Sequence, residues 1–206
     1  MTRLAILGAS GHGRVLADTA ECCGWSSVQF FDDAWPGLQF NHTWVVCGDS
    51  SALLERISQF DGVLVAIGDN RTRQAKLREL LAAGARLATL IHPSAVVSRY
   101  ATIEPGSVVL AGAVVNVGVR MGLGTILNTG CSVDHDCVLG GAVHISPGAR
   151  LSGGVCVGDL TWVGVGASVR QSIRLGAGVM VGSGAAVVAD VTDDLTVVGV
   201  PARVRL

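Results

Sequence analysis

The residues best suited to chemistry form one short polar cluster, Asn128-Thr-Gly-Cys-Ser-Val-Asp134-His135-Asp136, with His144 shortly after it. A neutral imidazole can accept a proton near neutral pH, and a neighbouring carboxylate stabilises the imidazolium that forms. His135 lies between Asp134 and Asp136 in a stretch that is otherwise poor in charge. We therefore expect His135 to act as a general base rather than as a solvated surface histidine.

This cluster belongs to a six-residue repeat. An aliphatic residue recurs at every sixth position from Ile91 to Val187, the position four residues after it is small or β-branched, and glycine is frequent just before that small position. Such a unit is typical of a parallel β-helix, in which three units close one triangular coil. Residues three units apart then stack at about 4.8 Å, so the run predicts a little over five coils with no inserted loop.

The repeat also predicts where the polar side chains lie. His135 follows its inward neighbour Val133 by two positions, so its ring points outward near a corner. Gly153 is one full coil further on, and we expect its bare backbone to leave space for a ligand and to offer an amide to an oxyanion. His144 is half a coil from His135 and on another face. The two histidines can then serve one site only if they come from neighbouring subunits.

Residues 1–90 follow a different pattern, in which apolar strands alternate with helices. Strands are predicted at 3–9, 27–31, 44–47, 62–67 and 87–91, and helices at 14–23, 50–58 and 71–83. This alternation predicts a parallel, doubly wound sheet of the Rossmann-like kind, whose ligands bind at the carboxyl ends of the strands. The predicted fold class is thus α/β plus all-β: a Rossmann-like domain over 1–90, then a parallel β-helix over 91–206 with a capping strand near its end.

Three polar clusters fall at those carboxyl ends, at 8–13, 32–33 and 68–70. The first is a glycine turn before a helix, where free amides and the helix dipole favour a phosphate. Its spacing, G-x-x-G-x-G, departs from the dinucleotide fingerprint G-x-G-x-x-G. Asp32 and Asp33 can accept hydrogen bonds from a ribose or sugar hydroxyl. Each cluster alone also fits a ligand-free βαβ unit, but together they indicate a mononucleotide or nucleotide-sugar site.

Composition excludes other classes of partner. The net charge of -1 offers no electrostatic footprint for nucleic acid or an anionic membrane. No apolar run approaches about 18 residues and the chain starts directly with a strand, so we expect no signal peptide, no membrane insertion and a cytoplasmic location. The 6 cysteines include no C-x-x-C pair, and Cys131 and Cys137 occupy the small inward positions of the repeat. We expect all of them to be reduced and structural.

The chain as a whole resembles the NeuD-type sugar acyltransferases. The resemblance rests on the opening Gly8-Ala-Ser-Gly-His-Gly, the segment Val133-Asp-His-Asp-Cys-Val-Leu-Gly-Gly, the segment His144-Ile-Ser-Pro-Gly-Ala, the final Gly199-Val-Pro-Ala-Arg and the six-residue repeat. Members of this family include the UDP-4-amino-sugar N-acetyltransferases of bacillosamine biosynthesis and the sialic acid O-acyltransferases. The resemblance implies a left-handed β-helix and a homotrimer, with acetyl-CoA as co-substrate between adjacent subunits and a nucleotide sugar held by the amino-terminal domain.

The resemblance also implies residue roles. His135 matches the catalytic base, and Asp136 matches the acidic residue that orients it, for which some members carry glutamate. The other matched positions are His144 for the acetyl group, Gly153 and Val165 for the CoA groove, and Ser10, Gly11, His12, Asp32 and Asp33 for the uridine diphosphate. Direct transfer to the amino group of a UDP-4-amino-4,6-dideoxy sugar, without a metal or a covalent intermediate, is the expected reaction.

Three alternatives remain open. The same base and donor would serve O-acetylation of a sialic acid or a CMP-sialic acid. A zinc-dependent prism enzyme would need three ligands in one site, and His135 and His144 are joined only by His92 at the start of the repeat. A non-catalytic partner would bind the nucleotide sugar and transfer nothing.

For the CoA phosphates, the candidates are Arg170, Arg174, Arg203 and Arg205.

Overall fold

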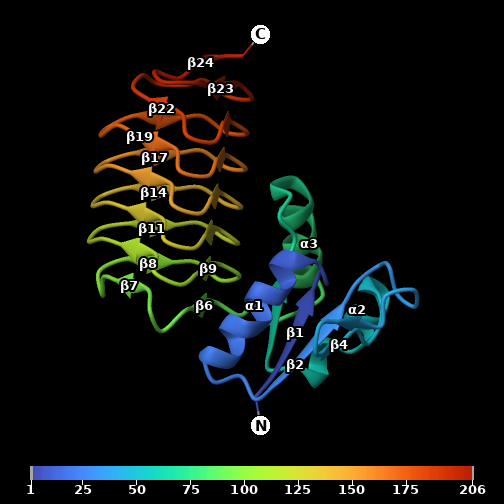
Figure 1. Ribbon diagram of the computed structural model, residues 1–206. Coiled ribbons are helices and arrows are strands. Elements are labelled where there is room, and N and C mark those ends of the chain that lie inside the picture. Colours follow the sequence, from blue (N-terminus) through green and yellow to red (C-terminus); the bar gives the residue numbers. More distant parts are fainter. Residues whose placement is uncertain (1, 206) are drawn as a thin grey trace. The chain divides into compact units, whose positions relative to one another are not determined.

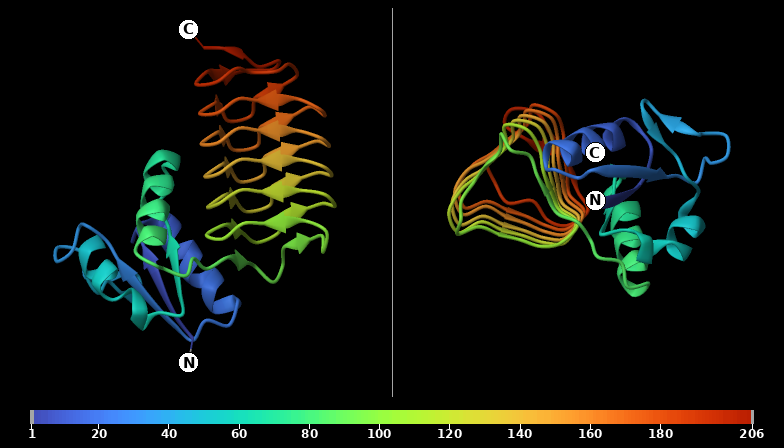
Figure 2. Two further views of the ribbon diagram at one scale, coloured as in Figure 1. Left: turned by 180° about the vertical axis from the view of Figure 1, so that it is seen from behind. Right: turned by 90° about the horizontal axis from the view of Figure 1, so that it is seen from below.

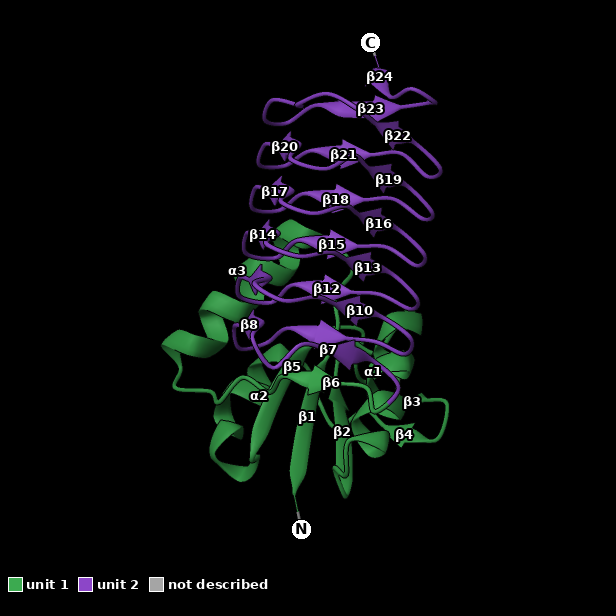
Figure 3. Ribbon diagram, turned by 90° about the vertical axis from the view of Figure 1, so that its left-hand side faces the viewer, with its two compact units in different colours: residues 1–93 green, residues 94–206 purple. Residues whose placement is uncertain are grey.

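The computed structural model describes residues 2–205, and the chain divides into two compact units, Met1–Pro93 and Ser94–Leu206 (Figure 3).

The first unit contains a three-stranded parallel sheet in the order β2-β1-β5 (Figures 1 and 3). Its strands are β1 (Arg3–Leu7), β2 (Ser27–Phe31) and β5 (Gly62–Val65). Its helices are α1 (Gly11–Cys22), α2 (Ser50–Glu55) and α3 (Asn70–Ala82), with a short 3-10 helix at Ile57–Gln59. The central β1 is apolar and buried along Leu4–Leu7, which is expected of a parallel strand covered on both faces.

The sheet has fewer strands than the sequence predicts, because two of the expected strands pair with it through single residues only. Residues near 44–47 form an antiparallel hairpin of β3 (Phe40–Asn41) and β4 (Trp44–Val45), and only Val46 bridges to β2. Residues near 87–91 contribute a single bridge from Leu87 to β5 and the short β6 (Leu90–Ile91). Both segments are too short to extend the central sheet by a full strand.

Helix α1 begins at Gly11, three residues earlier than the sequence predicts, with Ser10 as its N-cap. Gly13 therefore lies in the first helical turn, and a Cβ atom there would meet the Phe30 ring at 3.0 Å and the Gly8 carbonyl oxygen. The missing side chain lets the helix start directly against the loop that follows β1. As a result Gly11, His12 and Gly13 present first-turn amides rather than a free loop.

The second unit is a left-handed parallel β-helix of short strands with a three-sided cross-section (Figure 2). One side consists of β7 (Val96–Val97), β10 (Val114–Val115), β13 (Ser132–Val133), β16 (Arg150–Leu151), β19 (Ser168–Val169) and β22 (Ala186–Val187). The next consists of β8 (Thr102–Ile103), β11 (Arg120–Met121), β14 (Val138–Leu139), β17 (Cys156–Val157) and β20 (Arg174–Leu175). The third contains β9 (Val108–Val109), β12 (Ile126–Leu127), β15 (His144–Ile145), β18 (Trp162–Val163), β21 (Met180–Val181) and β23 (Thr196–Val198).

The register confirms the predicted stacking of one coil on the next. Ser132 pairs with Val114 in the coil before and with Arg150 in the coil after, and His144 pairs with Ile126 and Trp162. The second residue of each strand points inward. The small residue that lies four positions after it in the repeat is equally buried, as at Cys131 and Cys137. Burial of these apolar side chains, about 25 cal/mol per Å² removed from water, holds the coils together.

The last coil is covered as the sequence predicts. The strand β23 continues the parallel stack on β21, and β24 (Arg203–Val204) folds back antiparallel on β23. Val191 adds a bridge to Leu175 on another side. These pairings close the exposed edge that a parallel β-helix would otherwise present to other chains.

Candidate active site

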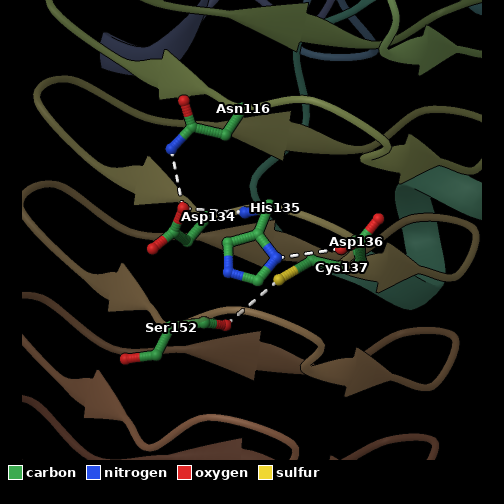
Figure 4. A network of polar contacts seen from close by, with 6 residues as sticks. All are labelled: Asn116, Asp134, His135, Asp136, Cys137 and Ser152. Carbon is green, nitrogen blue, oxygen red and sulfur yellow. Dashed lines mark hydrogen bonds and ion pairs between the residues drawn. The ribbon is translucent and has the colours of Figure 1, made fainter.

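The turn between β13 and β14 carries the Asp134-His135-Asp136 cluster (Figure 4). The His135 side chain is 57% exposed, and its Nδ1 lies 2.9 Å from Asp136 Oδ2. Because a carboxylate can only accept, Nδ1 carries the proton and Nε2 is the free acceptor of the neutral ring. The hydrogen bond to Asp136, with the charge of Asp134, raises the pKa of His135 above its usual value. The arrangement is that of an exposed base oriented by a carboxylate.

Asp134 organises the backbone of the same turn. Its Oδ1 accepts the His135 N–H at 2.8 Å and the Asn116 side-chain amide at 2.8 Å. The hydrogen bond from the His135 N–H, followed by that from Asn116, lowers the pKa of the Asp134 carboxyl. Asp134 therefore serves the main chain and Asp136 serves the ring, although the two carboxylates flank the same histidine.

Gly153 lies one coil after His135, as predicted, but the space beside it is not open. A Cβ atom at Gly153 would lie 2.5 Å from both Cε1 and Nε2 of His135. The expectation that bare backbone leaves this space for a ligand was wrong, because the imidazole itself occupies it. The absence of a side chain at Gly153 instead leaves the space that the imidazole occupies against the next coil.

His144 is buried on β15, on a different side of the β-helix from the His135 turn. Its Nε2 lies 3.1 Å from Asn128 Nδ2, and the Asn128 carbonyl oxygen accepts the Thr129 N–H at 2.8 Å, which fixes the amide orientation. Nε2 of His144 is therefore an acceptor. The ring stacks on Trp162 with centroids 4.5 Å apart, and the indole N–H donates to Ser146 Oγ at 2.7 Å. Sequence reasoning missed Trp162, although it lies one coil from His144.

Val165 is 53% exposed on the corner after β18. It borders an open pocket of about 280 Å³, together with Trp162 and Met180. The four arginines considered for the CoA phosphates, Arg170, Arg174, Arg203 and Arg205, are all exposed.

In the first unit, the loops after β1 and β2 meet as predicted. Asp32 accepts the Ala9 N–H at 2.7 Å through Oδ2 and the Ala34 N–H at 2.9 Å through Oδ1. Its carboxylate therefore shapes the loop that leads to Ser10 and Gly11, in addition to any ligand it contacts. Asp33 is exposed, and the Ser50 hydroxyl and backbone N–H lower its pKa.

His12 is part of a buried polar region at the start of α1. Burial, and then the charge of Arg73, lowers the pKa of His12 to about 4, so the ring is neutral at physiological pH. The Arg73 guanidinium is 1% exposed and donates to the carbonyls of Ile67 and Gly68 and to Asn70 Oδ1. It thereby fixes the third polar cluster, which sequence reasoning placed at 68–70 without identifying what holds it.

Among residues 2–205, no three His, Cys, Asp or Glu side chains gather in a way that could hold a metal ion. None of the helices there is long and apolar enough to cross a membrane. All six cysteines are free thiols.

Comparison with known proteins covers both units. The family model for the PglD N-terminal domain matches residues 3–80. The structure of the acetyltransferase domain of PglB from Neisseria gonorrhoeae FA1090 in complex with acetyl coenzyme A is 43% identical, covers 98% of both chains and has a TM-score of 0.94. PerB from Caulobacter crescentus, in complex with CoA and GDP-perosamine, is 38% identical over 100% of this chain and 98% of that one, with a TM-score of 0.95.

A curated relative, the UDP-N-acetylbacillosamine N-acetyltransferase of Bacillus subtilis (strain 168), is 38% identical over 115 residues, which are 54% of this chain and 52% of the relative. The two solved structures match this chain over nearly its full length and preserve both units. The chain therefore belongs to the NeuD-type sugar acyltransferase family.

Proposed function

We propose that this protein transfers an acetyl group from acetyl-CoA to the amine of a UDP-linked 4-amino-4,6-dideoxy sugar, with His135 as the general base. The observation that carries the proposal is the exposed His135 ring, held by Asp136 at 2.9 Å with Nε2 free to accept a proton. Family membership and the similarity to structures that hold acetyl-CoA or CoA support the donor. The glycine loop, Ser10, Gly11, His12, Asp32 and Asp33 form the proposed nucleotide site.

The reaction follows from these groups. The neutral amine of the sugar attacks the thioester carbonyl carbon, the C–N bond forms and negative charge develops on the carbonyl oxygen. His135 Nε2 takes the proton that the nitrogen loses, while Asp136 stabilises the imidazolium. The C–S bond then breaks, CoA leaves as the thiolate, and the amide product remains. A backbone N–H would donate to the developing oxyanion, and Gly153, which lies against the His135 ring, is the candidate that the sequence predicts.

Direct transfer to the amine is supported by the state of the nearby thiols. Cys137 follows the catalytic turn, but its Sγ donates to the Ser152 carbonyl at 3.2 Å, and burial raises the pKa of this thiol to about 11. Burial raises the pKa of Cys131 to about 12. A thiol in this state supplies almost no thiolate at neutral pH, so neither cysteine suits the role of acyl carrier.

We expect His135→Ala to lower kcat by at least about 10²-fold, the lower limit for general base catalysis. KM for acetyl-CoA should change little, because the imidazole acts on the amine. The measurement is thiol release from acetyl-CoA, together with mass spectrometry of the enzyme. Near-normal turnover by this variant, or an acetylated enzyme formed from acetyl-CoA alone, would contradict the proposed mechanism.

We propose a homotrimer, and the position of His144 supports an active site shared between subunits. His135 and His144 lie on different sides of one β-helix, so a second copy must approach for both to face the same substrates. We expect that mixing His135→Ala with His144→Ala protein, after unfolding and refolding together, restores roughly a quarter of wild-type activity, since random pairing leaves that share of interfaces with both histidines. Activity that stays at the level of the separate variants would place each site within one subunit.

A GDP-linked amino sugar is a second candidate substrate. It is favoured by the full-length similarity to PerB, whose structure holds GDP-perosamine. The UDP-linked substrate is favoured by the Bacillus subtilis relative. Competition by free UDP and free GDP against the same turnover separates the two, because the nucleotide that matches the site should inhibit at the lower concentration.

A further inference from the structure

The turn at residues 116–118, between β10 and β11, lies one coil before the His135 turn. The main chains of the two turns are joined by two hydrogen bonds. Asn116 N–H donates to the Val133 carbonyl at 3.0 Å, and Asp136 N–H donates to the Val117 carbonyl at 3.0 Å. Side chains on the earlier turn are thereby held at fixed positions beneath the two carboxylates that flank His135.

Asn116 contacts the first of these carboxylates. Its side-chain Nδ2 donates to Asp134 Oδ1 at 2.8 Å, and the same oxygen accepts the His135 N–H (Figure 4). The amide of Asn116 therefore limits how Asp134 can rotate while it holds the main chain of the histidine. Hydrogen bonds to a charged group are stronger than neutral ones, so this contact stabilises one turn geometry.

Gly118 determines where the second carboxylate can lie. A Cβ atom at Gly118 would be 2.5 Å from Asp136 Oδ1, a distance at which the carboxylate must move. Asp136 itself has a left-handed backbone, with φ 59°, which restricts the directions its side chain can take. The space beside Gly118 is therefore the position from which Asp136 reaches His135 Nδ1.

We propose that Asn116 and Gly118 are positioning residues for the proposed base, Asn116 by anchoring Asp134 and Gly118 by making room for Asp136. The inference rests on the role of His135 given under Proposed function. Gly118 also has a left-handed backbone, with φ 75°, like other glycines of the repeat. The turn conformation alone would explain a glycine here, so the sequence does not reveal that Gly118 also makes room for Asp136.

Few titratable groups face His135, so a change in its pKa can be attributed to Asp136. On its own turn they are Asp134 and Asp136. The adjoining turns bring Asn116, Val117 and Gly118 on one side and Ser152, Gly153 and Gly154 on the other, and none of these side chains titrates. A displaced Asp136 carboxylate should therefore lower the pKa of His135 towards its ordinary value of about 6.5.

The test compares Gly118→Ala with Gly112→Ala. Both glycines have the left-handed turn conformation, with φ 75° and 68°, so both substitutions introduce the same backbone strain. A Cβ at Gly112 meets only the Gly130 Cα at 3.9 Å and its amide nitrogen at 4.0 Å, which are ordinary contacts. The readouts are the pKa of the His135 imidazole, from an NMR titration assigned with His135→Ala, and the kcat of acetyl transfer.

For Gly118→Ala we expect the pKa of His135 to fall and kcat to drop about tenfold, with KM for acetyl-CoA within about twofold. Gly112→Ala should leave both readouts at wild-type values. Equal effects of the two variants, or an unchanged His135 titration in Gly118→Ala, would overturn the role of Gly118. The titration needs no substrate, so it can fail or succeed independently of whether any amino sugar is acetylated.

A second variant keeps the inference testable if Gly118→Ala does not fold. Asn116→Ala removes the donor to Asp134 and introduces no backbone strain, and we expect kcat to fall about fivefold while KM is kept. The control is Glu104→Ala, because Glu104 holds the same turn position at another corner and is exposed. If Asn116→Ala turns over as fast as Glu104→Ala, Asp134 does not depend on Asn116 and this part of the inference is wrong.

Discussion

Asp136→Asn separates the charge of the residue from its geometry. The Asn carbonyl oxygen can still accept the proton of His135 Nδ1, which lies 2.9 Å from Asp136 Oδ2. Asparagine also tolerates the left-handed backbone at this position, where φ is 59°. The variant should therefore fold normally and keep the ring in place, while the negative charge that stabilises the imidazolium is lost.

The expected effect has two parts. The pKa of His135 should fall towards about 6.5, because the hydrogen bond to Asp136, the first cause of its elevation, becomes a neutral one. The base works in its neutral form, which exists above this pKa, so the acidic limb of the kcat/KM profile should move to lower pH. The plateau should fall about tenfold, less than for His135→Ala, because a weaker base remains in the same position.

The assay is the pH profile of thiol release from acetyl-CoA between about pH 5 and 9, for wild type and variant. The control is Asp194→Asn, since Asp194 has the same left-handed turn conformation, with φ 57°, and is exposed on the last coil. A profile of Asp136→Asn that overlays the wild type, or an acidic limb that moves to higher pH, would refute the assignment of Asp136 as the partner of the base.

Three further predictions concern stability and binding. Thr161→Val should lower the free energy of unfolding in urea by about 2 kcal/mol, with Thr161→Ser restoring it, because the buried hydroxyl donates to the Gly176 carbonyl at 2.6 Å and accepts the Val179 N–H at 3.0 Å. Trp162→Phe should raise KM for acetyl-CoA about fivefold, measured by steady-state kinetics. The reason is that the variant loses the indole N–H hydrogen bond to Ser146 Oγ, which holds Trp162 in its stack on His144. Asp32→Asn should raise KM for the nucleotide sugar about tenfold with kcat kept, since an amide cannot accept both N–H groups that Asp32 binds.

The second unit could be predicted closely from the sequence, because its order is local and periodic. The six-residue spacing determines which residues point inward, and the stacking of one coil on the next correctly placed Gly153 beside His135. What the spacing could not give was the ring orientation. The imidazole lies against Gly153 because Asp136 holds its Nδ1, and a side-chain torsion of this kind has no signature in a repeat.

Some features were accessible from the same arithmetic and were missed. Trp162 follows His144, and Asp134 follows Asn116, by one full coil, so the pairing of both is a direct consequence of the period. In the first unit, the strand pairing could not be predicted from local sequence patterns. Strand pairing there depends on contacts between distant segments, and the residues near 44–47 satisfy their backbone groups in a local hairpin instead of the central sheet.

Above all, we propose that this protein acetylates a nucleotide-linked amino sugar. The most direct measurement is thiol release from acetyl-CoA in the presence of UDP- and GDP-linked 4-amino sugars, UDP-linked 3-amino sugars and sialic acids, with the products identified by mass spectrometry. We predict release with a nucleotide-linked 4-amino sugar, an N-acetylated product, and loss of both with His135→Ala. Release with a sialic acid alone, or binding of the nucleotide sugar without any transfer, would contradict the claim.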